Sequence, residues 1–406
     1  MTRILYVVRG EPISPDYSGA SSRYDQNFAA LTRLYGALDV LRLDEAAAFD
    51  RTYAFEQQSE TAQRVRQQAA SWQDVMLPVY TPAHSRAGRL WEALADPVTV
   101  EFRIKQETLA ALRDQIERCK PDLIWVEGTR LAAPLTKIHT PLPWILSQHD
   151  ILSNVHLIRR GNDTLAKRWK LLLARRAEAR VLSASPLIVT GSTSDMQRSQ
   201  ALGAPRVEVI AMAYESLLPA PVEPASAPLY IAHLGSLETT ANRAGLEAYL
   251  RKVQPELSRA GVSIPLMIIG DASKLKDPLL SLLRDAHADL KGFVPDLGEV
   301  LRPFNLAILP YESDSGYRTK LPVLFNHAQV VVTTRAAVQG MWIDGLDQVC
   351  VVLDRLEDFP AAITRLLAAP DERERLGRAA HAFYAAHWTL DTVLDAYRRL
   401  IDGALS

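Results

Sequence analysis

Residues 292–334 read GFVPDLGEVLRPFNLAILPYESDSGYRTKLPVLFNHAQVVVTT and contain two short apolar runs, LAIL at 306–309 and VVV at 330–332. Such runs, bounded by polar and turn-forming residues, are typical of buried strands. A polar loop and the start of a helix follow the first run. Open parallel sheets bind ligands at the carboxyl ends of their strands, and a phosphate suits the loop's hydroxyls, flexible backbone and cations. The loop residues behind this prediction are Tyr311, Glu312, Ser313, Asp314, Ser315, Gly316, Tyr317, Arg318 and Lys320.

Further short apolar segments alternate with helix-forming stretches along the chain. We predict strands in the first half at 4–8, 40–43, 123–126, 144–146, 187–190 and 207–210. The second half has predicted strands at 230–234, 265–269, 290–293, 306–309, 330–332 and 349–353. Residues 46–120 are predicted to be mostly helical. Strands that alternate with helices indicate an α/β protein with doubly wound parallel sheets.

The composition changes abruptly at residues 219–228, PAPVEPASAP, where four of ten residues are proline. Such a stretch is extended and poor in hydrogen bonds, as linkers between domains are. We therefore predict an N-terminal domain at 1–216, a linker at 217–228, a C-terminal domain at 229–385 and a last helix at 386–406. Two α/β domains joined by a hinge imply a ligand held in a cleft between them.

Bulk properties narrow the class of protein. The 406 residues exceed one ordinary core and suit two domains. The net charge of -1 argues against general nucleic-acid binding, which needs an excess of basic charge. Cys119 and Cys350 match no metal or redox spacing, so we predict reduced thiols. No apolar run approaches the roughly 18 residues of a membrane span, and the first apolar stretch is too short for a secretory signal, so the expected location is the cytoplasm.

Two places in the first half could contact a ligand. Gly19 lies in the small-residue run SGAS at 18–21, after the first predicted strand, where a backbone can approach a ligand closely. An ordinary turn between strand and helix explains the same run equally well. His149 follows the strand at 144–146 in the run SQHD, and a histidine at a strand tip is well placed to bond a ligand hydroxyl. The alternative is a histidine in a solvent-facing loop.

Residues 156–180 are strongly basic, with eight Lys or Arg residues against Asp163 and Glu178, and with Trp169 and leucines at 171–173 among them. One interpretation is a helix that rests on anionic lipid, which would put the protein at the inner face of the membrane. The other is a solvated helix that packs one side on the sheet. The sequence favours the second interpretation.

Several longer runs together resemble glycosyltransferase family 4, retaining enzymes of the GT-B fold that use nucleotide-sugar donors. GSLETTANRAGLEAYL at 235–250 resembles the first loop and helix of the family's C-terminal domain, and residues 292–324 resemble its donor-site block. LLAAPDERERLGRAAHAFYAAHWTLDTVLDAYRRL at 366–400 is similar to its closing helices, the last of which usually crosses back to the N-terminal domain. SGASSRYDQNFAAL and SQHDILS occupy the places of its glycine loop and acceptor-side histidine.

The resemblance implies two Rossmann-like domains that hold a donor diphosphate in the cleft between them. Arg318 and Lys320 would contact the phosphates, and His149 the transferred sugar. Cations fit because a departing nucleoside diphosphate gathers negative charge. No Asp-x-Asp pair is present, so neither a metal nor another cofactor is expected. The remaining implied donor contacts are Gly19, Gly235, Ser236, Asn242, Tyr311, Glu312, Ser315, Gly316 and Tyr317.

The sequence departs from the family at one donor contact above all. The family usually has a Glu at the start of the helix after the Arg/Lys pair, where it holds the ribose hydroxyls, and that position is Val323 here. A side chain without a carboxylate loses two charge-assisted hydrogen bonds of roughly 1.5–3 kcal/mol each. The usual Gly-Pro before the next strand is replaced by Ala328 and Gln329, and the usual Pro-Asn-Gly by residues 211–213, AMA.

The resemblance implies a retaining glycosyltransferase that moves a sugar from a nucleotide sugar to a glycan, lipid-linked or protein acceptor in the synthesis of surface polysaccharide or glycoconjugate. A second hypothesis is a catalytically degenerate GT-B protein that binds a partner or glycan, because Val323 replaces the expected Glu. A third, an epimerase or phosphorylase of the same fold, has less support, since the sequence lacks the lysine-rich cofactor signature of a phosphorylase.

Overall fold

The computed structural model describes residues 2–15, 17–81, 85–149, 151–153, 164–222, 229–273, 275, 277–294, 296–312 and 317–406. The chain divides into two compact units. Unit 1 holds residues 1–212 and 393–406, and unit 2 holds residues 213–392. The predicted linker at 217–228 lies at the start of unit 2 and is described as far as residue 222.

Unit 1 is built on a seven-stranded parallel sheet with the order β3-β2-β1-β4-β5-β6-β7. The strands are β1 Ile4–Arg9, β2 Asp39–Glu45, β3 Ser71–Leu77, β4 Leu123–Glu127, β5 Trp144–Gln148, β6 Leu187–Thr190 and β7 Val207–Val209. The direction of winding reverses between β1 and β4, which pair through Ile4 and Leu123. In doubly wound sheets a ligand crevice forms at the carboxyl ends of the two strands at such a reversal.

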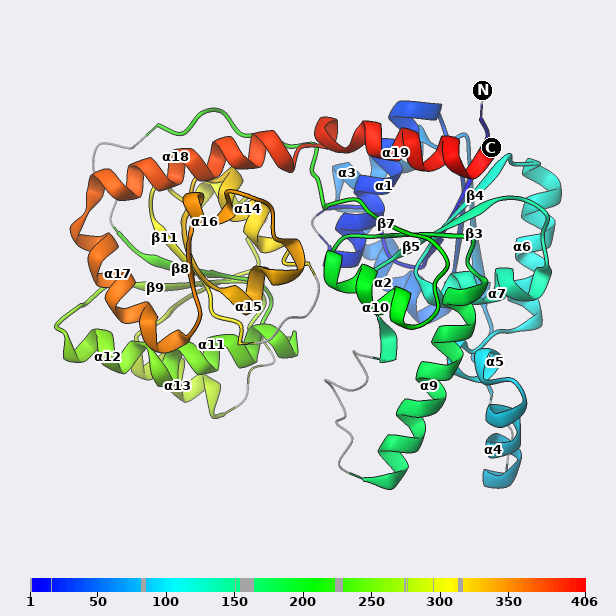
Figure 1. The fold of residues 1–406 in the computed structure, drawn as a ribbon, viewed down its shortest axis with the longest axis horizontal. Helices are drawn as coiled ribbons and strands as arrows, with labels where there is room; N and C mark the ends of the chain where they lie inside the picture. Colours follow the sequence, from blue (N-terminus) through cyan, green and yellow to red (C-terminus); the bar gives the residue numbers. More distant parts are fainter. Residues whose placement is uncertain are drawn as a thin grey trace. The chain divides into compact units, whose positions relative to one another are not determined.

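Helices cover both faces of this sheet (Figure 1). Successive strand residues point to opposite faces, so Leu5 and Val7 pack with the core under α6, α7 and α9. Tyr6 points the other way and makes an edge contact with Phe28 of α1 at 5.9 Å between ring centroids. The helices are α1 Gly19–Tyr35, α2 Ala46–Glu56, α3 Glu60–Gln68, α4 Arg86–Ala95, α5 Pro97–Phe102, α6 Gln106–Cys119, α7 Thr129–Ile138, α9 Leu165–Ala184 and α10 Thr193–Ala201.

Residues 46–120 are mostly helical, as predicted, but the prediction missed strand β3. It pairs in parallel with β2 along its whole length, and Val75 and Leu77 pack on the core. Its polar residue Asp74 binds the fully buried guanidinium of Arg42 on β2 (Nε to Oδ1, 2.8 Å). A partly exposed edge strand with a charged residue inside it lacks the apolar run on which the prediction relied.

The C-terminal helix α19, Leu390–Leu405, begins in unit 2 and continues into unit 1 from residue 393. Within unit 1 its Tyr397 is fully buried, and the Tyr397 ring lies 5.8 Å from that of Trp125 on β4. The last residues of the chain therefore complete the core of the first unit.

Unit 2 is built on a six-stranded parallel sheet with the order β10-β9-β8-β11-β12-β13. The strands are β8 Ile231–Leu234, β9 Leu266–Ile269, β10 Asp289–Gly292, β11 Leu306–Leu309, β12 Val330–Thr334 and β13 Val351–Leu353. Here the reversal falls between β8 and β11. Apolar strand residues such as Ile308 and Val332 are fully buried in one core cluster, as expected for strands covered on both faces.

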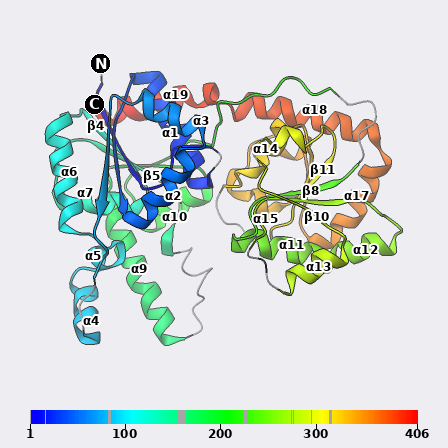
Figure 2. The ribbon, with the colours of Figure 1, turned by 180° about the vertical axis from the view of Figure 1, so that it is seen from behind.

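Two layers of helices enclose the second sheet (Figures 1 and 2). Helices α11 to α13 lie on one side, and α14 and α18 lie on the other, packed against each other. The helices are α11 Thr240–Lys252, α12 Gln254–Arg259, α13 Leu279–Asp285, α14 Lys320–Asn326, α15 Arg335–Val338, α16 Leu346–Val349, α17 Phe359–Ala368 and α18 Pro370–His387.

Candidate functional site

Four of the predicted donor residues meet at the reversal point of the second sheet. Tyr311 follows β11, Asn242 lies in the first turn of α11, which comes after β8, and Lys320 is the first residue of α14. The Lys320 ammonium donates to the amide oxygen of Asn242 and to the Tyr311 hydroxyl (3.0 Å). The Arg318 guanidinium carbon lies 4.1 Å from the centre of the Tyr311 ring. We call Asn242, Tyr311, Arg318 and Lys320 the Lys320 cluster.

The surroundings of the cluster change the acidity of its members. Burial lowers the pKa of Lys320 to about 7, and the neighbouring charge of Arg318 acts in the same direction. Burial raises the pKa of the Tyr311 hydroxyl to about 12. The Tyr311 hydroxyl is therefore neutral and donates to the Asn242 amide oxygen (2.9 Å). Two cations held close together without a carboxylate in the cluster favour an anion beside them.

Gly235 is glycine for a steric reason. Its φ is 130°, in a region that side chains rarely adopt, and a Cβ there would collide with Lys320 and lie 2.8 Å from the amide nitrogen of Asn242. Gly270, at a φ of 140°, likewise allows the β9 loop to approach the backbone of Gly235 and Ser236. The predicted Gly235 and Ser236 thus lie at the Lys320 cluster, and Ser236 accepts a hydrogen bond from Asn242 through its carbonyl (2.7 Å).

His233 belongs to the same region, and sequence reasoning missed it. It lies inside β8, fully buried, and its two ring nitrogens have no hydrogen-bond partner in the described part of the chain. Burial, together with the nearby charge of Lys320, lowers the pKa of His233 to about 3. A histidine inside the apolar run IAHL was the available signal, since a buried polar group needs an explanation.

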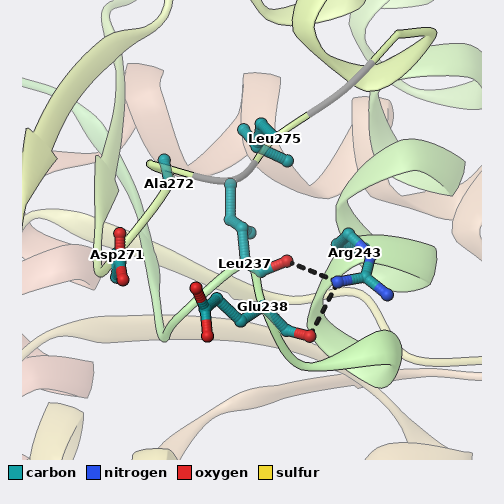
Figure 3. A pocket seen from close by; sticks show the side chains of 6 residues that line it. All are labelled: Leu237, Glu238, Arg243, Asp271, Ala272 and Leu275. Atoms are coloured by element: carbon teal, nitrogen blue, oxygen red, sulfur yellow. Dashed lines mark hydrogen bonds between the residues drawn. The ribbon is translucent and has the colours of Figure 1, made fainter.

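A cavity of about 210 Å³ opens beside the loop that contains Gly235 and Ser236. It is lined by Leu237, Glu238, Arg243, Asp271, Ala272 and Leu275 (Figure 3). Arg243 binds the carbonyl oxygens of Leu237 (3.0 Å) and Glu238 (2.7 Å) and thereby holds the loop. In Figure 3 the Glu238 and Asp271 carboxyl groups lie on the side of the cavity away from Arg243.

The other predicted donor residues are not part of the Lys320 cluster. Ser315 and Gly316 lie outside the described residues, and Tyr317, beside Arg318, is partly buried. Glu312 is exposed and forms an ion pair with Lys252 (2.6 Å). Val323 lies within α14, one turn after Lys320.

In unit 1, His149 follows the carboxyl end of β5 and is held by a buried carboxylate. Its Nε2 donates to Oε2 of Glu127, the last residue of β4, at 2.7 Å. The other oxygen of Glu127 accepts from Tyr6 (2.7 Å), Asn27 (2.8 Å) and Trp125 (2.8 Å). Burial alone would raise the pKa of Glu127, but the hydrogen bonds from His149, Tyr6 and Asn27 hold it below its usual range. Glu127 is thus ionised at neutral pH, and sequence reasoning missed it.

Gly19 is the first residue of α1, and Ser18 caps that helix by accepting from the Ser21 amide (3.0 Å). The loop before α1 is anchored by the Ser21 hydroxyl, which donates to the carbonyl of Ser14 (2.8 Å). Further along α1, Arg23 donates to the carbonyl of Ile210 (2.9 Å), after β7. The predicted Gly19 therefore lies at a helix N-terminus at the carboxyl edge of the first sheet.

The described residues contain neither a candidate metal cluster nor a candidate membrane span. No group of three or more His, Cys, Asp or Glu side chains there could hold a metal ion. None of the described helices is both long enough and apolar enough to cross a membrane.

Comparison with known proteins shows which families and folds this chain resembles. Residues 228–369 match the family model described as glycosyl transferases group 1, which covers most of unit 2 and the Lys320 cluster. No curated protein matches the sequence.

Solved structures match the chain over nearly its whole length. The Anabaena protein HepE, solved with UDP, has a TM-score of 0.66 and 11% identity over 99% of this chain and 100% of that one. The sucrose-phosphate synthase of Thermosynechococcus elongatus has a TM-score of 0.65 and 12% identity over 99% and 100%. TarM has a TM-score of 0.67 and 10% identity over 98% of each chain.

The chain therefore has the GT-B fold, an α/β architecture of two Rossmann-like units that each contain a parallel sheet. The match of unit 2 to the group 1 model supports a glycosyltransferase of that fold.

Proposed function

We propose that the protein is a retaining glycosyltransferase that transfers a sugar from a nucleotide-sugar donor to a glycan, lipid-linked or protein acceptor in the synthesis of surface polysaccharide or glycoconjugate. The observation that carries this proposal is the Lys320 cluster, two cations packed around Tyr311 at the reversal point of the second sheet. HepE, a structural neighbour, was solved with UDP-glucose, which supports a nucleotide sugar as the donor.

In the proposed reaction, Arg318 and Lys320 bind the donor diphosphate. An acceptor hydroxyl attacks the anomeric carbon on the face from which the diphosphate departs. The new carbon–oxygen bond forms as the bond to the β-phosphate breaks, and the hydroxyl proton passes to the departing phosphate. Arg318 and Lys320 stabilise the negative charge that develops on the leaving group, the stage at which electrostatic stabilisation accelerates a reaction most. Neither a metal nor another cofactor is part of this proposal.

The cavity beside Gly235 and Ser236 is the proposed place for the donor nucleoside. Val323 cannot accept hydrogen bonds from ribose hydroxyls, whereas Glu238 and Asp271 bring carboxyl groups to this cavity. We infer that one of these two replaces the glutamate that the resemblance to family 4 leads us to expect.

In unit 1, we propose that His149 contacts the transferred sugar and that Glu127 positions its ring. With Nε2 donating to Glu127, the Nδ1 atom of a neutral His149 accepts hydrogen bonds, which suits a sugar hydroxyl. Tyr24 packs edge-on against the ring (5.1 Å between centroids) and restricts its rotation.

The direct test is a transfer assay with UDP-, GDP-, ADP- and dTDP-linked sugars and a panel of glycan and lipid-linked acceptors. The proposal predicts release of one nucleoside diphosphate, and loss of that release in Arg318→Ala. Arg335→Ala, at an exposed arginine of the same unit, is the matched control and keeps full release. No release from any donor would contradict the proposal.

A second candidate function is that of a catalytically degenerate binding protein, which Val323 favours. That hypothesis predicts that neither transfer nor donor hydrolysis occurs, and that Arg318→Ala and Lys320→Met leave the biological function intact. Any turnover that depends on Arg318 rules it out.

We also propose that unit 1 makes peripheral contact with an anionic membrane at the cytoplasmic face. Helices α4 and α9 extend away from the first sheet (Figures 1 and 2). They expose Trp91, Leu165, Trp169 and Leu172, with exposed fractions of 73%, 84%, 45% and 55%. Lysine and arginine residues lie between the apolar side chains of α9, the combination that membrane-surface helices use. The part of the predicted basic segment at 156–163 lies outside the described residues.

A further inference from the structure

Unit 1 contains a small cation-rich cavity that the donor chemistry does not use. It lies at the carboxyl ends of β1, β2 and β3 and is bounded by α7 and by the chain after α5. We propose that this cavity is a second anion site, which binds a phosphate or carboxylate group of the acceptor.

The charges around the cavity are unbalanced. It is lined by four cations, Arg9, Arg103, Lys105 and Arg130, and by only two carboxylates, Asp44 and Glu45. Both carboxylates are already engaged, because Asp44 pairs with Arg9 (2.9 Å) and Glu45 with Lys105 (3.2 Å). Within the described ranges, Arg103 and Arg130 have no ion-pair partner, so the lining carries two uncompensated positive charges.

This charge imbalance affects the pKa of Arg130. Arg130 lies in the first turn of α7 and is partly buried, and Leu131 and Pro134 of the same helix also line the cavity. Burial lowers the pKa of Arg130, and the charges of Arg9 and Arg103 lower it further, whereas Asp44 and Glu45 act in the opposite direction. Gathering guanidinium groups in a partly dehydrated cavity costs free energy that a bound anion would recover.

The size of the cavity limits what can enter. Its volume is about 50 Å³. One water molecule needs about 10–15 Å³ of such space, so the cavity has room for a compact polar group such as a phosphate or carboxylate. Guanidinium groups bind both anions through paired N–H donors.

The position of the cavity links the anion to the acceptor. Arg130 follows Glu127 by three residues, and both lie at the same edge of the first sheet as His149. An acceptor whose anionic group occupies this cavity is therefore held at the edge where the His149 ring is positioned. This assignment to the acceptor rests on the proposed transferase function, whereas the anion site itself does not.

The test is arginine labelling with phenylglyoxal, read out peptide by peptide in the full chain by mass spectrometry. Sodium phosphate and glycerol 3-phosphate are the soluble probes, and sodium chloride at equal ionic strength is the control. We expect about tenfold slower labelling of Arg130 and Arg103 when the probe is in about tenfold excess over its Kd. Exposed Arg113 on α6 provides the internal reference and should label at an unchanged rate.

Calorimetry with the same probes tests the residues individually. Arg130→Gln should weaken phosphate binding about tenfold or more, and Arg113→Gln should not change it. Vesicles that contain phosphatidic acid distinguish the sources of the anion. Protection by these vesicles alone assigns a lipid phosphate, and protection by glycerol 3-phosphate assigns a soluble one. Equal protection by chloride, or none by any probe, overturns the site.

The outcome is separable from that of the proposed function. Lys320→Met removes a donor contact in unit 2 and should leave the protection of Arg130 by phosphate unchanged. If no nucleotide sugar binds but phosphate still protects Arg130, the transferase proposal fails and the anion site stands. If donors bind and turn over but no probe protects Arg130, the anion-site proposal fails and the transferase proposal stands.

Discussion

Lys320 carries an ammonium group that the fold partly dehydrates and places beside Arg318. Its pKa of about 7 means that the unliganded protein holds both charged and neutral forms at neutral pH. A bound diphosphate favours the charged form and must raise this pKa. Donor binding at about pH 8 should therefore take up a proton, and affinity should fall as pH rises above about 7. Calorimetry in buffers of different ionisation enthalpy measures this uptake, which Lys320→Met should abolish.

The stability of the same variant gives an independent check. The folded pKa of Lys320 lies below its usual value of 10.5, so the unfolded chain binds the extra proton between about pH 7 and pH 10.5. The stability contributed by Lys320 therefore rises with pH across that range, and below it the buried charge is a constant cost. The unfolding free energy of Lys320→Met, relative to that of the wild type, should be highest near pH 6 and should decrease progressively toward pH 10. A difference in unfolding free energy that does not vary with pH would contradict the assignment.

Glu127 is the residue whose replacement should most disturb the first unit. In Glu127→Gln one amide replaces a carboxylate that accepts four hydrogen bonds, so buried donors of Tyr6, Asn27 or Trp125 lose partners. We expect a loss of about 2 kcal/mol or more in unfolding free energy at neutral pH. The exposed Glu117→Gln on α6 should change it by less than about 0.5 kcal/mol.

The pH dependence of this loss in unfolding free energy follows from the lowered pKa of Glu127. The stability that Glu127 contributes is present above its unfolded pKa near 4.5 and disappears as pH falls through the lower folded value. The difference in unfolding free energy between wild type and Glu127→Gln should therefore become smaller as the pH falls below about 4.5. Transfer rates should fall with little change in the donor KM, because Glu127 acts through His149. A variant with wild-type stability and turnover would remove Glu127 from the account.

At the residue level, the sequence led to the Lys320 cluster but not to its surroundings. Arg318, Lys320, Tyr311 and Asn242 were predicted as donor contacts from one loop and a resemblance, and the fold brings them together. Glu127 and His233 were missed because each belongs to an otherwise apolar strand, and one polar letter there does not reveal its surroundings. The hydrogen-bond partners of Glu127 include Asn27, which lies far away in sequence.

At the level of elements, apolar runs were sufficient to predict the central strands of both sheets. Every strand predicted from the sequence overlaps an observed one, and the central strands, which are covered on both faces, consist almost wholly of apolar residues. Edge strand β3 was not predicted because its stability comes partly from the ion pair between Asp74 and Arg42. Hydrophobic periodicity cannot reveal such a contact. Basic helix α9 was predicted in outline, and its exposed tryptophan and leucines keep the membrane hypothesis open.

The membrane proposal makes a prediction about α9. Trp169→Ser with Leu172→Ser should reduce binding to vesicles of anionic lipid about tenfold or more, because each apolar side chain contributes roughly 1.5–3 kcal/mol when buried. Phe293→Ser in unit 2 removes a side chain that is 63% exposed and should leave binding unchanged. Vesicle flotation measures both. Equal binding to neutral and anionic vesicles by the wild type would sink the proposal.

At the level of the whole molecule, the chain leaves unit 1, forms unit 2 and returns through α19. The returning segment supplies Tyr397, whose hydroxyl donates to Asn27, itself bonded to Glu127. The end of the chain thus supports the network that positions His149. Composition and alternation of strands indicated two α/β units, but the sequence could not show which buried side chains the returning segment contributes.

Removal of residues 393–406 tests this support. The segment buries Val393, Tyr397, Leu400 and Ile401, and each apolar side chain contributes roughly 1.5–3 kcal/mol. Truncation after residue 392 should lower the unfolding temperature of unit 1 and reduce transfer. Deletion of residues 404–406, of which the last two are exposed, should do neither. Unchanged unfolding after the longer truncation would show that the segment does not stabilise unit 1.

The central claim is that the Lys320 cluster binds the diphosphate of a nucleotide-sugar donor. Calorimetric titration of UDP, GDP, ADP and dTDP into the wild-type chain and Arg318→Ala tests it most directly. The account predicts that at least one nucleotide binds the wild type, and that Arg318→Ala weakens its binding by about tenfold, or about 1.4 kcal/mol, or more. Absence of binding by all four, or equal affinity in the variant, would contradict it.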